Sequence, residues 1–346
     1  MQLPSDMAST NVTGIVCSGG KLEQWAIIVI SVLTAMFSLA AIAGNTLVLV
    51  AIYRSPQLQI VSNFFLASLA MADLFVGMVI DPVLIAKTIK NVNSFDKDWL
   101  AIAAVVLSLQ SVTATVYNLC IVSIDRYFAI TNVFKYAEII TPRRCVLAIA
   151  TVWVLSIFFG FSRFFVKDDK DLPALWSIAS VITFIIPFCV IAFCYFKIFR
   201  VAKTQSRRIV TTNTAFACQQ WRQCKRDRKA AYTVGIIIGI FLAFFFPNLV
   251  LSSLQNSTQD ECYKQKLDYY YFWFTILNFG GSAINPWIYG LRNQEFRYAF
   301  RKMLGFSKSN SNVESWSHIK KFSDGISDRK ISKQSHTDTG IVVQDL

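Results

Sequence analysis

Seven long stretches of the chain contain almost no charged residue, and each is long enough to cross a membrane as a helix. A hydrocarbon layer of about 30 Å needs about 20 helical residues. Of the 346 residues, 54% are hydrophobic and 16% charged, which is more apolar surface than a soluble domain of this size can bury. The pattern predicts an all-α membrane protein, a bundle of seven transmembrane helices. The stretches comprise approximately residues 25–53, 61–87, 99–131, 142–163, 173–201, 229–254 and 268–291.

Positive charge gathers in one of the segments between these stretches. Residues 197–229 contain ten Lys and Arg and one acid, Asp227, whereas the loops of the opposite side carry balanced charge. Cytoplasmic loops of membrane proteins have this excess of Lys and Arg. The 202–228 loop and the C-terminus are therefore expected inside the cell and the N-terminus outside, in the plasma membrane. The net charge of +13 thus points to the lipid bilayer and indicates no nucleic-acid partner.

The segments outside the bundle divide into an outer and an inner part. Residues 1–24 are expected to form an extracellular tail, without the basic start and apolar core of a signal peptide. Residues 305–346 are expected to form a disordered cytoplasmic tail, too polar to fold alone. The membrane domain, 25–304, ends in a short amphipathic eighth helix over 293–304, of the kind that lies along a membrane surface.

The outer segments contain two glycosylation sequons and two cysteines. The sequons begin at Asn11 and Asn256. Cys17 and Cys262 are the two of the chain's eight cysteines on this side, so a disulfide between them and two separate thiols are both open. Four other cysteines fall within the stretches, where a thiol packs as a small apolar group.

Few polar side chains interrupt the apolar stretches, and such groups normally face the interior of a bundle. Asn45, Asp73 and Asn285 each lie in the middle of a stretch. They either bond to one another and stabilise the bundle, or they take part in function.

The third stretch has the clearest helical pattern. Spacings that alternate between four and three residues fall on one face of a helix. The residues on that face are Ser108, Val112, Thr115, Leu119, Val122 and Arg126. The face ends at Asp125-Arg126-Tyr127, where an arginine lies beside its own counter-ion, and Asp227 is a candidate for a second one. An arginine that exchanges such partners forms a switch between two helix packings.

Short motifs follow one another along the chain, one per stretch. They are Gly44-Asn45, Leu69-Ala-Met-Ala-Asp73, Asp125-Arg126-Tyr127, Trp153, Pro187 with Tyr195, Phe241 with Pro247, and Asn285-Pro286-Trp287-Ile288-Tyr289. In this order they resemble the rhodopsin-like, or class A, G-protein-coupled receptors over residues 25–304. The branch that looks nearest is the amine, adenosine and melanocortin-like group.

The resemblance implies a receptor that binds an extracellular ligand and activates a heterotrimeric G protein when the sixth helix swings outward around Pro247. Four residues are similar to the family's sodium pocket, the sole cofactor site expected: Asp73, Thr115, Ser282 and Asn285. Arg126, Tyr195 and Tyr289 are similar to the triad that rearranges on activation, and Phe134 to the side chain that packs into the G protein. A receptor kinase and arrestin are further expected partners, with tail serines as phosphorylation candidates. These serines are Ser307, Ser309 and Ser311.

Three departures from the family pattern limit the choice of ligand. Ala101 stands where the family has a cysteine bridged to the second outer loop, and Ser108 where amine receptors have the aspartate that binds the ligand. Phe279 stands where opsins have the retinal lysine. Neither a conventional amine receptor nor an opsin is indicated, and both a small molecule and a peptide stay open as ligand.

The family geometry assigns the ligand cavity to side chains in the outer half of the bundle. The candidates are Asp81, Ser108, Val112, Phe245, Asn248, Ser252, Tyr271, Thr275 and Asn278. Each either contacts the ligand or packs between helices. Asp81, next to Pro82, either binds a cationic ligand or extends toward water.

Two other classes of protein fit the sequence less well. An enzyme is not indicated, because both histidines lie in the tail and no phosphate-binding glycine loop or Ser/His/Asp arrangement occurs. The alternative is a small multi-span transporter, which is expected to have internal repeats and paired broken helices, and the sequence has neither.

Overall fold

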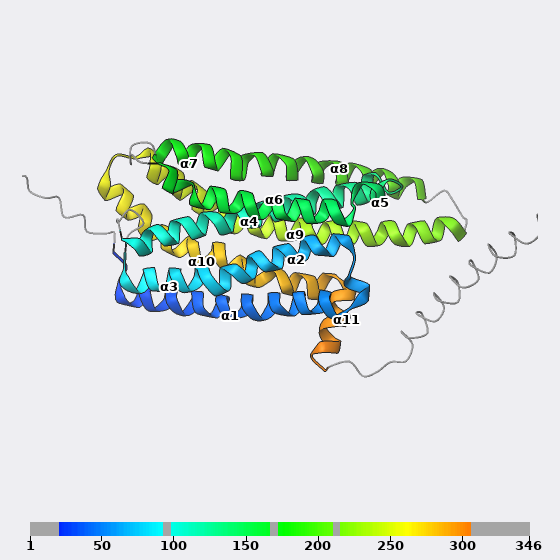
Figure 1. The fold of residues 1–346 in the computed structure, drawn as a ribbon, viewed down its shortest axis with the longest axis horizontal. Helices are drawn as coiled ribbons and strands as arrows, with labels where there is room; N and C mark the ends of the chain where they lie inside the picture. Colours follow the sequence, from blue (N-terminus) through cyan, green and yellow to red (C-terminus); the bar gives the residue numbers. More distant parts are fainter. Residues whose placement is uncertain (1–20, 93–97, 167–171, 210–214, 306–346) are drawn as a thin grey trace, which may run out of the picture. The chain divides into compact units, whose positions relative to one another are not determined.

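The computed structural model describes residues 21–92, 98–166, 172–209 and 215–305, and within these ranges every regular element is a helix (Figure 1). The helices are α1 (Gln24–Arg54), α2 (Val61–Phe75), α3 (Asp81–Lys90), α4 (Trp99–Thr131), α5 (Tyr136–Ile139), α6 (Pro142–Gly160), α7 (Leu172–Ser180), α8 (Ile186–Ile209), α9 (Ala215–Ser257), α10 (Glu261–Arg292) and α11 (Gln294–Met303). Short π-helical turns join α2 to α3 and α7 to α8, so each pair forms one span. The predicted spans and the short eighth helix are therefore confirmed as helices.

At the start of α4 and of α6, a side chain accepts a hydrogen bond from a free backbone N–H group of the first turn. Asp98 accepts a hydrogen bond from the Leu100 amide at 2.8 Å. Thr141 caps α6, with Pro142 at the first helical position, where a proline loses no hydrogen bond. The Lys90 side chain pairs with Asp98 and, together with the Leu100 amide, holds the pKa of that carboxyl below its usual range.

The chain just before α1 is tied to the end of α3. Asn91 ends α3 with a φ of 52°, a left-handed conformation that asparagine adopts more readily than most residues. Its side chain accepts a hydrogen bond from the Leu22 amide at 3.1 Å and donates one to the Leu22 carbonyl at 3.0 Å. One amide side chain therefore ties the start of α1 to the end of α3 at one end of the bundle.

The four prolines within the spans lie in two kinds of local structure. Pro247 and Pro286 lie inside α9 and α10. Pro82 and Pro187 each follow a π-helical turn, Val76–Ile80 and Val181–Ile185. A proline ring clashes with the carbonyl four residues earlier, and the extra residue of a π-turn moves that carbonyl away. These two spans therefore accommodate proline without ending the helix.

Helix α4 lies at the centre of the bundle and packs against α2, α3, α6, α8 and α9. The Trp153 indole of α6 donates a hydrogen bond to the Ser68 hydroxyl of α2 at 3.2 Å. A Cβ atom added at Gly160 would lie 2.3 Å from Cβ and 2.9 Å from Cα of Gln110, so only glycine permits this approach of α6 to α4. The hydrophobic effect cannot drive association between helices within lipid. Close packing at small residues such as Gly160 contributes instead.

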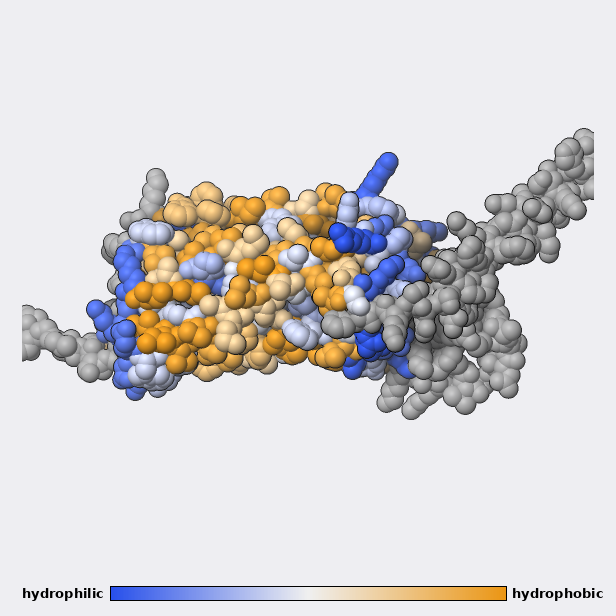
Figure 2. Space-filling view, turned by 90° about the horizontal axis from the view of Figure 1, so that it is seen from below, coloured by the Kyte–Doolittle hydropathy of each residue, from blue (hydrophilic) through white to orange (hydrophobic). Residues whose placement is uncertain are grey.

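The surface of the bundle is apolar around its middle. On the face shown in Figure 2, hydrophobic residues cover the middle and hydrophilic residues gather toward the two ends. Large apolar side chains with more than half of their surface exposed include Met36, Leu39, Val146, Leu147 and Val154. Six of the described helical spans are long and apolar enough to cross a membrane. The seventh stretch lies in α10, whose tyrosines, asparagines and charged first turns make it less apolar.

One boundary expected from the sequence is wrong. Residues 202–228 were assigned to a loop, but α8 continues to Ile209 and α9 begins at Ala215. The segment is rich in Lys, Arg, Gln and Ala, which favour the helix and need no burial, so the helices extend beyond the apolar stretches. The predicted tails, 1–24 and 305–346, fall almost entirely outside the described residues.

Replacing Gly160 by alanine is expected to lower the thermal stability of the detergent-solubilised protein. Overpacking of this kind costs about 1–3 kcal/mol. The control is Gly239→Ala, because no atom lies within 4 Å of a Cβ at that position. Melting temperatures of the two variants, measured side by side, check the prediction. Equal melting temperatures would contradict the close packing of α4 on α6.

Candidate functional site

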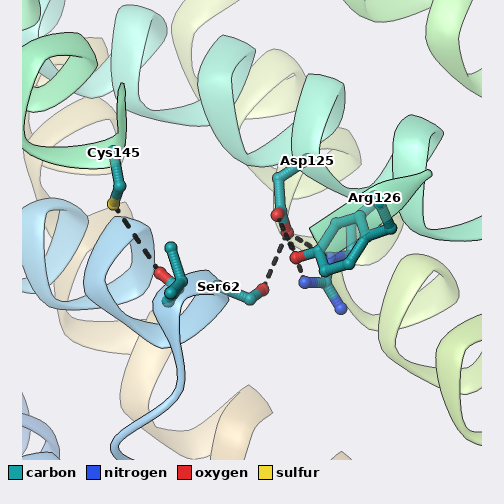
Figure 3. A network of polar contacts seen from close by, with 6 residues as sticks. Ser62, Asp125, Arg126 and Cys145 are labelled. Atoms are coloured by element: carbon teal, nitrogen blue, oxygen red, sulfur yellow. Dashed lines mark hydrogen bonds and ion pairs between the residues drawn. The ribbon is translucent and has the colours of Figure 1, made fainter. Parts of the chain in front are cut away.

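A buried carboxylate at one end of the bundle accepts hydrogen bonds from three side chains (Figure 3). Asp125, on α4, accepts from Nε of Arg126 at 2.8 Å and also forms an ion pair with that guanidinium. Ser62, at the start of α2, donates to Asp125 at 2.7 Å, and Tyr136 of α5 donates at 2.6 Å. The predicted pairing of Asp125 with Arg126 is present, and Ser62 and Tyr136 extend it to two further helices.

The hydroxyl of Tyr136 is a permanent donor in this cluster. Burial, followed by the neighbouring Asp125 carboxylate, raises the pKa of Tyr136 above its usual value. The hydroxyl therefore keeps its proton at physiological pH. Cys145 of α6 lies beside the cluster and contacts the Val61 carbonyl at 3.7 Å (Figure 3).

A second polar group lies deep among the apolar residues of the bundle. Asn285 of α10 donates a hydrogen bond to Asp73 of α2 at 2.7 Å. Asn45 of α1 donates to the Ser282 carbonyl at 3.1 Å. The close approach of α1 to α10 requires Gly44, because a Cβ there would lie 2.8 Å from the Pro286 ring. The three polar residues predicted in mid-span therefore belong to one seam across α1, α2 and α10.

This seam opens on a cavity of about 20 Å³. The four predicted sodium-pocket residues, Asp73, Thr115, Ser282 and Asn285, all line it. Ser111, which the sequence analysis missed, lines it as well. It lies one helical turn before Thr115, and that spacing could have identified it. The predicted ligand residues Val112 and Asn278 are also part of this wall.

Other predicted switch residues contact separate partners in this conformation. Tyr195 of α8 donates to the Ala231 carbonyl of α9 at 3.1 Å. Tyr289 is buried and stacks on Phe296 of α11, with ring centroids 5.6 Å apart. The Tyr127 ring lies 6.2 Å from that of Phe193 on α8. None of these contacts joins Arg126, Tyr195 and Tyr289 to one another.

Aromatic side chains lie close to Pro247 of α9. Phe245, two residues before Pro247, stacks on Phe241 with centroids 5.5 Å apart, and its ring lies 4.6 Å from that of Phe184 in the π-turn before α8. Asn248 is buried next to this kink. A rotation of Phe245 would therefore change the packing between α9 and the π-turn that precedes α8.

A second cavity of about 20 Å³ lies between α1, α3 and α10, toward the end of the bundle opposite the Asp125 cluster. Three predicted ligand residues, Asp81, Tyr271 and Thr275, line it. Lys87 lines it too, and the sequence analysis missed it. Lys87 is an ionisable residue at the end of the predicted 61–87 stretch. Such residues are rare within membrane spans, so the sequence could have identified it. Ser108 and Ser252 are partly exposed and line neither of these two cavities.

Several predicted sites fall at or beyond the described part of the chain. Cys262 is disulfide-bonded, and its partner lies outside the described residues, as Cys17 does. The side chain of Asp227 and the sequon at Asn11 also lie outside them. Asn256 is in α9, one residue before the C-terminal end of that helix.

These features define a class of protein: a multi-helix membrane protein in which a polar seam lies between an outer cavity and an arginine at the opposite end. A family model described as 7 transmembrane receptor (rhodopsin family) matches residues 44–289. The chain therefore belongs to the rhodopsin family of G-protein-coupled receptors. This confirms the resemblance seen in the motifs and disfavours the transporter alternative.

Individual relatives come from the amine branch of the family. The chain is 28% identical to the histamine H2 receptor of Cavia porcellus over 294 residues, 80% of this chain and 79% of that receptor. It is 30% identical to the D(1C) dopamine receptor of Xenopus laevis over 332 residues, 82% of this chain and 69% of that receptor. The histamine H2 receptor of Homo sapiens is 26% identical over 303 residues, 82% of each chain.

Replacing Tyr136 by phenylalanine is expected to raise ligand-independent nucleotide exchange on a G protein severalfold. The change removes one donor to Asp125, and a hydrogen bond to a charged group contributes about 1.5–3 kcal/mol. The control is Tyr53→Phe, which deletes the same atom from a side chain that is 81% exposed. Neutralising Asp227 is expected to act in the same direction. Equal basal exchange in the Tyr136 and Tyr53 variants would contradict the role of the cluster.

Proposed function

We propose that this receptor transmits an extracellular signal by exchanging the partners of Arg126, so that α9, the sixth span, swings outward and a G protein binds at the cytoplasmic end. The observation that carries the proposal is the Asp125 cluster, in which one buried carboxylate holds Arg126 and is itself held from α2 and α5. An arginine held in this way has two alternative packings, and a ligand shifts the population between them.

The contact between α8 and α9 supports movement of the sixth span. Tyr195 reaches the main chain of α9 at Ala231, and a Cβ added at Gly235 would lie 3.0 Å from the Tyr195 ring. The Tyr195 side chain therefore lies between α8 and α9 and bonds to α9 at this level. Farther out, the ring of Pro247 weakens the backbone of α9, so the inner part can move about this kink.

The proposed orientation has the N-terminus outside the plasma membrane and the C-terminus in the cytoplasm. The Lys and Arg of residues 197–229 support it, because they would face the cytoplasm. The cytoplasmic partners are then a G protein, a receptor kinase and arrestin, and the protein acts as a receptor rather than an enzyme. Alanine substitution of the tail serines, followed by an arrestin-binding measurement, would test the arrestin step.

We further propose that the cavity beside Asp73 binds sodium. Its residues fit the ion: Oδ1 of Asp73 and Oγ of Ser111 are buried without a hydrogen-bond partner in the described part of the chain. Thr115 and Ser282 add oxygen-bearing side chains to the same wall. Hard cations prefer such oxygen ligands. Asn285 donates to the other oxygen of Asp73 and so orients the carboxylate. A bound sodium ion would supply the positive charge that this buried carboxylate requires.

Replacing Phe134 by alanine is expected to reduce agonist-stimulated nucleotide exchange at least tenfold while leaving ligand affinity unchanged in the absence of G protein. Its side chain is 88% exposed, and such apolar groups at interface centres contribute about 2 kcal/mol or more. The control is Phe165→Ala, a side chain that is 70% exposed at the outer end of the bundle. Exchange that falls equally in both variants, or in neither, would count against a G-protein contact at Phe134.

Sodium is expected to raise the melting temperature of the purified receptor relative to potassium, and Asp73→Asn is expected to abolish the difference. A ligand at ten times its dissociation constant stabilises the folded state by about 1.4 kcal/mol. The control is Asp81→Asn, which neutralises a buried carboxylate outside this cavity and should keep the sodium effect. The same response to sodium in the Asp73 variant and the wild type would exclude the site.

A further inference from the structure

The outer cavity contains an acidic group whose hydrogen-bonding capacity is incompletely used. Asp81, the first residue of α3, is 1% exposed and lines the cavity between α1, α3 and α10. Its Oδ2 atom has no hydrogen-bond partner among the described residues. A buried carboxylate without a partner is costly, because it has lost its hydration. This atom therefore marks a position where a positively charged or donating group would bind.

Two further charged side chains are buried in this region. Lys87 on α3 and Asp268 on α10 are buried together with Asp81, at 3% and 0% exposure. The Lys87 ammonium lies 4.7 Å from the ring centroid of Phe272 and 5.9 Å from that of Tyr271, so it occupies aromatic faces on the α10 side. The Asp81 carboxylate would attract a cation in this cavity and repel an anion.

The remaining walls of the cavity also suit an organic cation. Phe37, Tyr271 and Phe279 present aromatic rings and Leu84 and Ile276 aliphatic carbon. Aromatic faces attract a cation, by about 0.5–2 kcal/mol according to its desolvation. At about 20 Å³ the space takes a head group of few atoms. A larger ligand would have to separate the helices, and this couples occupancy to helix packing.

Ser108 stands at the position where amine receptors have the aspartate that binds the ligand. The histamine and dopamine receptors to which this chain is similar are named for amines. Ser108, on α4, carries no charge and lines neither described cavity. Among the residues that line these two cavities, Asp73 and Asp81 are the carboxylates, and Asp73 is bonded to Asn285 in the deeper one. Asp81 is therefore the carboxylate that lines the cavity between α1, α3 and α10.

We propose that the cavity between α1, α3 and α10 is the site at which this receptor binds a small primary amine, with the ligand ammonium donating to Oδ2 of Asp81. The proposal rests on the receptor function given above and specifies the class of its ligand. The counter-ion of the amine then comes from α3, and the ligand lies against α10, which also carries Asn285. Binding at this cavity acts directly on the helix that completes the polar seam.

The test uses purified full-length receptor and a panel of arylalkylamines, each compared with the alcohol that replaces its ammonium by a hydroxyl. Phenethylamine and 2-phenylethanol form one such pair, and phenylalanine is the matching zwitterion. Amines are expected to raise the melting temperature and stimulate nucleotide exchange, and the alcohols are not. Asp81→Asn is expected to weaken amine potency by between about tenfold and a hundredfold, since a hydrogen bond to a charged group is lost. Asp81→Glu should retain most of it.

The matched control is Asp98→Asn, which neutralises an outer carboxylate outside the cavity and leaves a residue that still caps α4. A second variant, Asp81→Asn combined with Ser108→Asp, moves the carboxylate to α4 and is expected not to restore the amine-dependent rise in melting temperature.

Three results would overturn the proposal: equal amine potency in Asp81→Asn and Asp98→Asn, equal responses to amines and alcohols, or no response to any amine. A measurement of basal nucleotide exchange distinguishes failure of the amine site from failure of the receptor function. A wild type whose basal exchange depends on Arg126 but ignores amines refutes only the amine site. A wild type without any exchange refutes the proposed function as well.

Discussion

The bond between Asp73 and Asn285 is the constraint on which the rest of this bundle depends. Helices within lipid gain nothing from hiding apolar surface against one another, so polar contacts and close packing must hold them together. The bond at 2.7 Å joins the second span to the seventh, and Asn45 extends the contact to the first. A buried carboxylate without a hydrogen-bond partner is strongly destabilising. The helices that supply its partners are therefore held in position.

The two ends of the bundle differ in the hydrogen bonding of their buried carboxylates. At the inner end, Asp125 has partners on every side, and the arrangement is closed. At the outer end, Asp81 keeps an oxygen without a partner in the described chain. A fully satisfied cluster stabilises one packing, whereas an incompletely satisfied one favours whatever supplies the missing partner. The Asp125 carboxylate is thus fully hydrogen-bonded within the chain, whereas Asp81 leaves a position at which a donating group would fit.

Sequence reasoning recovered the parts of the molecule that follow from local pattern. The spans could be predicted because lipid requires about 20 apolar residues in a row. Asp73, Asn285 and Arg126 could be found because polar groups are rare in such a setting. Tyr136 could not, because it lies in a short connection and reaches Asp125 only through the tertiary fold. Lys87 was missed because its position at the edge of a span permits either water or the interior. Helix continuation through 202–209 and 215–228 was missed because apolar length was taken as the limit of the helix.

The π-helical turn at Val76–Ile80 has a consequence for what the second span presents to the interior. In an uninterrupted α-helix, eight residues from Asp73 to Asp81 would rotate the second carboxylate about 80° away from the first, at about 100° per residue. The additional residue in the π-turn removes one such step and reduces the difference to about 20°. Two acids that a regular helix would direct apart thus share one face, at different depths. The single inserted residue changes the rotation of the helix between positions 73 and 81. Because of this change, Asp81 is buried in the bundle rather than turned away from it.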